Sequence, residues 1–246
     1  MSFGKSVAAK YFLFGGICSL LGAGSTLYLT RERKFINDPS SEQPSDKALL
    51  QYPMRKFESR YKSTKELEKE LGELKIVKEL RKDQNKWKEL PFSYGINEKH
   101  KSTSFVHSTL NEPDHLLLPP IMFVEKEKKE VVYIFYIGQK LCGHPGITHG
   151  GVQAILYDEA MARPAFLNLP RNSAFTAYLN INYKSPAFVN QILIMKCKLE
   201  ETDGRKALVT ASLENTDNTI ISTAESLFVA PRQAELIPDR SKDFDL

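Results

Sequence analysis

The sequence predicts an α+β fold in which one long helix is wrapped by an antiparallel sheet. A His-Gly-Gly turn at residues 149–151 opens the helix, and stretches of alternating polar and apolar residues predict strands on both sides of it. Asp203-Gly204 is the clearest turn signal, because Asp-Gly favours a two-residue hairpin. Two predicted strands precede the helix and four follow it, at residues 121–125, 131–137, 176–185, 192–199, 206–214 and 219–229.

The start of the predicted helix carries the residues best suited to chemistry. Gly150 and Gly151 let a ligand approach the bare backbone N–H groups of the first turn. These N–H groups have no partner inside the helix, and the helix dipole favours negative charge beside them. The segment therefore predicts an oxyanion hole that includes His149, with Asp158 further along the helix as a general base or nucleophile.

The spacing of these groups predicts a dimer. His149 and Asp158 are nine residues apart, which puts them half a turn out of phase and about 13 Å apart along the helix axis. Gly151 lies on the same side as Asp158 but still about 10 Å away. Because one substrate carbonyl cannot touch both, each site is expected to combine the helix start of one subunit with the aspartate of another.

The strand after the helix opens at Thr176 and ends before Pro186. Its strict alternation predicts that Thr176 lies on the polar face of the strand. The predicted polar face holds Thr176, Tyr178, Asn180 and Asn182, and the predicted apolar face holds Ala177, Leu179, Ile181 and Tyr183.

Three motifs together resemble the hotdog-fold thioesterase superfamily. They are the helix motif from His149 to Asp158, the strand Thr-x-x-Leu-Asn-Ile-Asn-Tyr-Lys-x-Pro from Thr176, and the hairpin Glu-x-x-Asp-Gly-Arg-Lys from Glu200. The likeness is strongest to the PaaI-like branch and to the mitochondrial acyl-CoA thioesterases called thioesterase superfamily members. Fungal mitochondrial membrane proteins of this family carry a block similar to residues 143–151, Gly-His-Pro-Gly-x-x-His-Gly-Gly.

The resemblance implies a membrane-anchored acyl-CoA thioesterase, which hydrolyses a fatty acyl-CoA to free fatty acid and CoA. In the family pattern the glycine after the motif histidine, here Gly150 or Gly151, polarises the thioester carbonyl. The pattern makes Asp158 the base or nucleophile, and Thr176 the residue that positions the attacking water. No metal and no redox cofactor is implied.

The chain departs from the family pattern at Gly143, where some members carry Asn or Gln and where the adjacent His144 would have to stand in. The hotdog fold also hosts hydratases and non-catalytic members, so the fold alone does not fix the reaction. A hydratase is disfavoured, because no Asp and His pair stands at hydratase-like spacing on the helix. The alternative is a non-catalytic hotdog protein that binds acyl chains or scaffolds a mitochondrial membrane complex.

Two adjacent acids on the helix compete for the catalytic role. Asp158 and Glu159 point about 100° apart, and the family spacing favours Asp158. Glu159 is expected to make a structural contact, for example with Arg163, its i+4 neighbour. Basic candidates for binding the CoA phosphates are Lys184, Lys196, Lys198, Arg205 and Lys206.

The N-terminus predicts a single-pass membrane anchor at residues 11–30. These twenty residues carry no charge and just span a bilayer core of about 30 Å. The first 34 residues hold five of the 34 basic residues and one of the 30 acidic ones, so the rest is balanced and gives no case for nucleic-acid binding. A cleaved secretory signal and a mitochondrial presequence merged with an anchor remain open. The glycine-rich, moderately apolar span favours a mitochondrial membrane, the inner one above all.

A connector joins this anchor to the predicted catalytic domain. Residues 37–53 form a polar, proline-containing linker, and residues 63–66 form a capping box at a helix start. The following apolar stripe, Leu67, Leu71, Leu74 and Val77, predicts a helix packed on the domain or on its dimer mate, with a regulatory or membrane-surface helix as the alternative. We therefore divide the chain into an anchor (1–34), a linker and helical connector (35–100), a hotdog domain (101–233) and a tail (234–246), assembled as a homodimer or tetramer.

Overall fold

The computed structural model describes residues 63–233 and 239–243. The predicted membrane span at residues 11–30, the linker at residues 37–53 and most of the predicted tail lie outside the described residues. Within 63–233 and 239–243, no helix is both long enough and apolar enough to cross a membrane.

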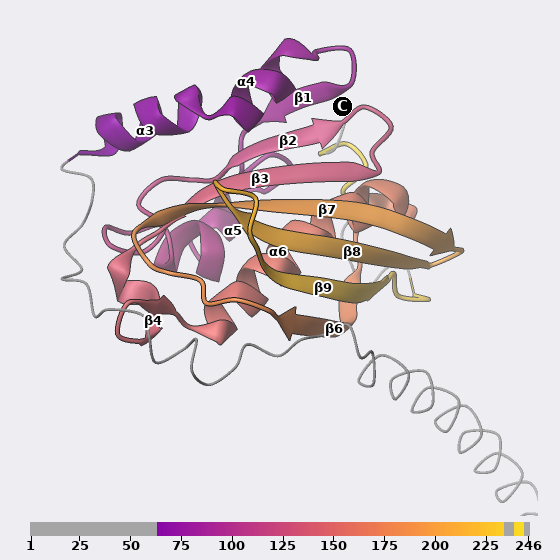
Figure 1. Ribbon diagram of the computed structural model, residues 1–246. Helices are drawn as coiled ribbons and strands as arrows, with labels where there is room; N and C mark the ends of the chain where they lie inside the picture. Colours follow the sequence, from indigo (N-terminus) through magenta and orange to yellow (C-terminus); the bar gives the residue numbers. More distant parts are fainter. Residues whose placement is uncertain (1–62, 234–238, 244–246) are drawn as a thin grey trace, which may run out of the picture. The chain divides into compact units, whose positions relative to one another are not determined.

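A seven-stranded sheet forms the frame of the domain (Figure 1). Its strands are β1 (Trp87–Leu90), β2 (Ile121–Glu125), β3 (Glu130–Ile137), β6 (Phe175–Tyr183), β7 (Gln191–Asp203), β8 (Lys206–Asn215) and β9 (Ile220–Val229). They run in the order β1-β2-β3-β7-β8-β9-β6, with every neighbouring pair antiparallel, so β1 and β6 are the two edges. All six strands predicted from the sequence are present.

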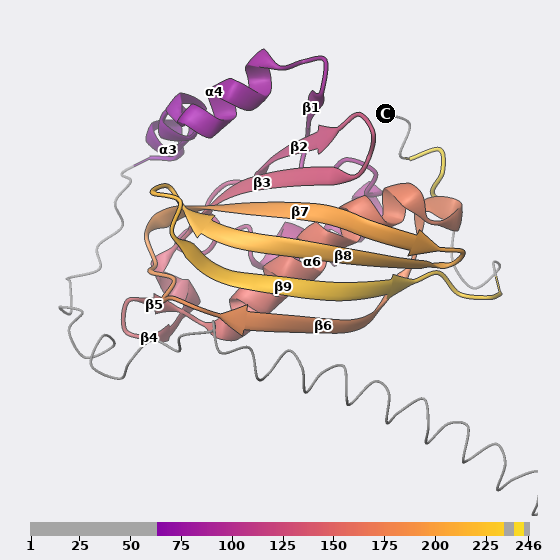
Figure 2. The ribbon, with the colours of Figure 1, turned by 45° about the vertical axis from the view of Figure 1, so that its right-hand side comes forward.

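The long helix α6 (Gly150–Asn168) lies against one face of this sheet, which curves around it (Figure 2). Its apolar side is buried, with no exposed surface at Tyr157, Met161 or Ala165. These side chains share one core with inward-facing sheet residues such as Tyr133 and Phe228. Burial of this whole side holds the helix in place, because removing apolar surface from water is the main favourable term in folding. The predicted α+β hotdog fold is confirmed.

Two short helices cover part of the opposite face of the sheet, over β2, β3 and β7. They are α3 (Thr64–Glu73), where the Ser63 hydroxyl caps the helix by accepting from the Glu66 N–H at 3.3 Å, and α4 (Lys75–Lys82). Leu74 separates them, with an extended ψ of 135°. The apolar stripe packs on the chain's own sheet, against a cluster that includes Phe123, Ile134 and Ile194. Of the alternatives predicted for this apolar stripe, the structure therefore shows packing on the chain's own domain.

The edge strand β1 lies inside the segment that the sequence assigned to the connector. Trp87 pairs with Glu125 and Leu90 with Met122, so residues 87–90 extend the sheet. Trp-Lys-Glu-Leu shows no apolar alternation, so only its pairing with β2 identifies it as a strand. The remaining short elements are α5 (Glu98–Lys101), η1 (Phe105–Thr109), η2 (Gln139–Leu141), β4 (Cys142–His144), β5 (Ile147–Thr148) and η3 (Pro170–Asn172).

Candidate active site

A small hairpin sets the position of the helix start. Strands β4 and β5 pair with each other, and Gly146, at a φ of 79°, makes the turn between them. The N–H of Thr148 donates to the carbonyl of Ala187 at 2.7 Å, and the N–H of His149 donates to that of Leu141 at 2.8 Å. The chain is thus held on both sides immediately before α6 begins.

His149 caps the helix through both its side chain and its backbone. Its Nδ1 accepts from the Gly151 N–H at 2.9 Å, and its carbonyl accepts from Val152 at 3.0 Å. The sequence did not decide whether Gly150 or Gly151 donates its backbone N–H to a substrate oxygen. Of these two amides, that of Gly151 is already engaged, whereas within the described part of the chain the N–H of Gly150 has no hydrogen-bond partner.

Gly143 packs directly against the capping histidine. A Cβ at this position would lie 3.0 Å from the Cα and from the Cδ2 of His149, so a larger residue would push on the cap. The position at which the family pattern suggested an Asn or Gln side chain is therefore filled by the capping histidine. His144, the proposed stand-in, is exposed on β4.

The structure brings Asp158 and Thr176 together. The Thr176 hydroxyl donates to Oδ1 of Asp158 at 2.7 Å. The strict alternation predicted for this strand is wrong at its start, because β6 bulges between Thr176 and Tyr178 and the bulge moves Thr176 to the face of the helix. Thr176 is paired across the strands with the buried Phe228, on the same face as Leu179 and Ile181.

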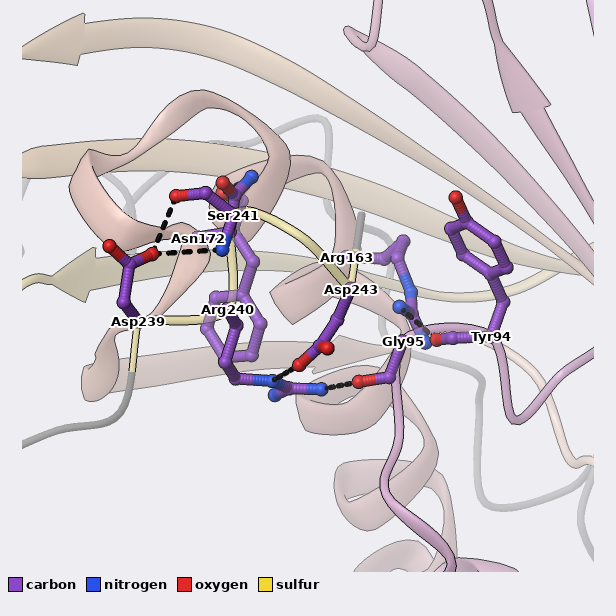
Figure 3. Close-up of polar contacts among 9 residues, drawn as sticks. Tyr94, Gly95, Arg163, Asn172, Asp239, Arg240, Ser241 and Asp243 are labelled. Atoms are coloured by element: carbon purple, nitrogen blue, oxygen red, sulfur yellow. Dashed lines mark hydrogen bonds and ion pairs between the residues drawn. The ribbon is translucent and has the colours of Figure 1, made fainter. Parts of the chain in front are cut away.

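The two adjacent acids lie in different environments. Asp158 is exposed to solvent, whereas burial raises the pKa of Glu159 in spite of the nearby guanidinium of Arg163. Figure 3 shows that the recorded hydrogen bond of Arg163 goes to the Tyr94 carbonyl, at 2.7 Å. Arg240, from the described C-terminal segment, donates to the next carbonyl, that of Gly95. Glu159 therefore lies near the positive charges of Arg163 and Arg240, and Asp158 is the acid that is open to a substrate.

One chain does not bring the two halves of the candidate site together. Gly150 and Asp158 are eight residues apart in α6, or about 12 Å along its axis. The strand next to them, β6, is a free edge of the sheet, and exposed aromatic rings mark its two ends: Phe175 is 59% exposed and Tyr183 is 47% exposed. A cavity of about 710 Å³ lies between α4, β1 and β2, and neither Gly150 nor Asp158 lines it.

Three of the five candidate phosphate-binding residues lie in or beside two different parts of the sheet. Lys196 and Lys198 are on the sheet face away from α6, and their ammonium groups contact Glu214 at 2.7 Å and Glu200 at 3.0 Å. Lys184, in contrast, directly follows Tyr183, whose hydroxyl contacts the first residue of α6. Among the described residues, no cluster of three or more His, Cys, Asp or Glu could hold a metal ion.

The chain is similar to a known protein family and to several known proteins. A family model described as the thioesterase superfamily matches residues 145–222, which include the helix start, Asp158 and Thr176. A UPF0644 protein of Schizosaccharomyces pombe is 31% identical over 192 residues, covering 76% of this chain and 73% of that protein. The acyl-coenzyme A thioesterase THEM4 of Rattus norvegicus is 33% identical over 48% of this chain and 49% of its own length. An uncharacterized mitochondrial membrane protein of Saccharomyces cerevisiae, FMP10, is 27% identical over 50% and 52%.

A sheet wrapped around one helix, with a glycine pair at the helix start and an aspartate on its exposed side, defines a hotdog thioesterase-like protein. The chain belongs to the thioesterase superfamily. The match spans about half the length of the last two relatives.

Proposed function

We propose that this protein is an acyl-CoA thioesterase. The observation that carries the proposal is the hydrogen bond between Thr176 and Asp158, 2.7 Å long, on the exposed side of α6. A protein that only bound an acyl chain would need neither group. The name of the rat relative, an acyl-coenzyme A thioesterase, supports the choice of substrate class.

The proposed reaction combines the start of α6 from one subunit with Asp158, in the middle of α6, from its partner. The thioester oxygen accepts a hydrogen bond from the Gly150 N–H, at the positive end of the helix dipole. The Thr176 hydroxyl donates a hydrogen bond to the Asp158 carboxylate, so its oxygen lone pairs are free to accept a hydrogen bond from a water molecule. Asp158 takes a proton from that water as the water oxygen attacks the carbonyl carbon. The C–S bond then breaks, and the CoA sulfur leaves with the proton.

A second route uses the same residues. Asp158 attacks the carbonyl carbon itself and the C–S bond breaks, so that CoA leaves as the thiolate. Water then hydrolyses the mixed anhydride to free fatty acid and the restored carboxylate, and the proton released goes to the CoA sulfur. Both routes need the negative charge of the tetrahedral intermediate to lie against the Gly150 amide. Both therefore fail if that N–H is removed.

A homodimer through the free edge of β6 would complete the site. If two β6 strands pair antiparallel about Leu179, Phe175 of one chain faces Tyr183 of the partner subunit. Asp158 and Thr176 of the first chain then approach the partner's helix start. The exposed rings at both ends of the strand support this pairing, because such an edge is otherwise a hazard for aggregation.

We further propose that residues 11–30 anchor the protein in a mitochondrial membrane, most suitably the inner one. The twenty uncharged residues and the mitochondrial name of the yeast relative support this location. Alkaline carbonate extraction should leave the full-length protein in the membrane pellet and release a form that lacks residues 1–34. Recovery of the full-length protein in the soluble fraction would reject the anchor.

The test of activity is a panel of acyl-CoA substrates, from acetyl to palmitoyl, given to the full-length protein. Release of free CoA above background, lost in Asp158→Asn, is the expected result. The second candidate, a non-catalytic acyl-binding or scaffolding protein, is favoured by the missing side chain at Gly143. It would bind the same substrates without releasing CoA from any of them.

A further inference from the structure

The peptide group between Gly150 and Gly151 is held at both of its polar ends. Its carbonyl, that of Gly150, accepts from the Tyr183 hydroxyl at 2.8 Å. Its N–H, that of Gly151, donates to Nδ1 of His149 at 2.9 Å. Two adjacent glycines would otherwise leave this turn with wide backbone freedom, since glycine has no Cβ to restrict it.

Tyr183 reaches this carbonyl from the last position of β6. It is paired across the sheet with Ser222, which is fully buried and is bonded both to Tyr157 and to Gln153 of α6, at 2.9 Å each. The strand end and the helix are therefore tied together beneath Tyr183. Partial burial raises the pKa of the Tyr183 phenol, so its hydroxyl keeps its proton and remains a donor at neutral pH.

The fit between Tyr183 and the helix start is close. A Cβ on Gly150 would lie 3.3 Å from the Tyr183 oxygen and 3.4 Å from its Cζ. The ring thus sits against the bare backbone of Gly150, at the residue whose N–H has no partner among the residues described. Tyr183 takes no part in the bond-making or bond-breaking steps of either route of hydrolysis.

We propose that Tyr183 is a positioning residue: together with His149 it locks the Gly150–Gly151 peptide, and this restricts the backbone of Gly150, whose own N–H in the preceding peptide is then presented to the thioester oxygen. This inference rests on the proposed thioesterase function. A preorganised donor costs no reorganisation as charge develops, so a loosened one should slow the chemical step and leave substrate binding intact. Tyr183 itself gains and loses no proton in the reaction.

The test compares two single-hydroxyl deletions in the same strand of the full-length protein. Tyr183→Phe removes the clamp, whereas Tyr178→Phe removes a hydroxyl that contacts Glu225 on the opposite face, also at 2.8 Å. Tyr183→Phe should lower kcat about tenfold, the scale of one lost hydrogen bond. Its KM and the midpoint of its pH–rate profile should not move, and amide hydrogen exchange at Gly151 should become faster. Tyr178→Phe should match the wild type in all four measurements.

Two results would overturn the inference: a Tyr183→Phe variant with wild-type kcat, or an equal loss of kcat in Tyr178→Phe. A wild-type protein that hydrolyses no acyl-CoA would instead reject the proposed function. In that case amide exchange at Gly151 decides alone. Faster exchange in Tyr183→Phe would support the clamp, and unchanged exchange would reject it.

Discussion

At Gly150 a proline substitution can test whether the backbone N–H takes part in the reaction. It is the first residue of α6, where a proline is well tolerated because the N–H has no partner within the helix. His149 before it has φ −60° and ψ 133°, which is the extended conformation that a following proline requires. Gly150→Pro therefore removes the proposed oxyanion donor with little change to the backbone.

We expect Gly150→Pro to lower kcat by about 10²–10³, as the loss of one oxyanion donor typically does. Gly150→Ala is the matched control, because it adds a Cβ at the same place and keeps the N–H. Steady-state kinetics on the two variants makes the comparison. Wild-type activity in Gly150→Pro would remove the Gly150 N–H from the reaction.

The exposed Asp158 and the half-buried Glu159 should respond differently to loss of charge. Asp158→Asn should lower kcat by at least about 10², as removal of a general base does, while the fold survives. Glu159→Gln should keep most of the activity. Kinetics with circular dichroism checks both variants, and the reverse pattern would transfer the catalytic role to Glu159.

The raised pKa of Glu159 also gives this residue a pH signature. The folded state holds the Glu159 proton more tightly than the unfolded state does. Its stabilising contribution is therefore present below the unfolded pKa, near 4.5, and is lost as the pH rises through the folded pKa. The melting temperature of the wild type should fall more than that of Glu159→Gln across this interval. If the melting temperatures of the two proteins changed equally with pH, this prediction would be wrong.

At the scale of elements, α3 and α4 stabilise the sheet through its outer face. Leu67 of α3 has no exposed surface and lies among Phe123, Ile134 and Ile194 of the sheet. Leu67→Ala should therefore lower the free energy of unfolding by about 2–5 kcal/mol, the usual cost of truncating a buried leucine. Lys69 is exposed in the same helix, so Lys69→Ala should change the free energy of unfolding by less than about 0.5 kcal/mol. Urea denaturation measures both, and equal stabilities would show that α3 does not pack in solution.

Sequence patterns predicted the elements that bury a regular apolar face. The strand at residues 121–125 was predicted with its observed bounds, and the strands at 206–214 and 219–229 are within one residue of β8 and β9. The four-residue β1 carries no pattern of its own, so it was missed. The bulge after Thr176 was missed as well, because alternation gives no sign of where a strand gains a residue.

The candidate site was less accessible to sequence reasoning than the fold. The His-Gly-Gly spacing indicated the helix start, but histidine is not among the usual N-cap residues, so its contact with Gly151 was not expected. The contact of Tyr183 with Gly150 joins residues 33 apart in the chain. Only the folded sheet brings such a pair together, and no local pattern predicts it.

At the scale of the whole molecule, the proposed dimer makes a complementation test possible. Gly150→Pro and Asp158→Asn each destroy both sites of their own homodimer. A mixed dimer has one site with both intact halves and one with both defects. Random 1:1 reassociation should therefore restore about a quarter of the wild-type activity, since half of the dimers are mixed.

The control for that experiment mixes Asp158→Asn with the double variant that carries both changes, which should restore nothing. CoA release after unfolding and joint refolding gives the readout. An active protein that is monomeric by light scattering would contradict the shared site.

The distance between Gly150 and Asp158 along α6 also bears on how activity depends on the amount of protein. In the proposed dimer a lone chain carries two incomplete sites, so at low abundance the rate would rise with the square of the concentration. Attachment to a bilayer would change this, because chains confined to a surface meet at a much higher effective concentration than chains diffusing in three dimensions. The anchor proposed at residues 11–30 would then keep the protein dimeric and active at low expression levels. A domain released from the membrane would dissociate into inactive monomers at the same levels.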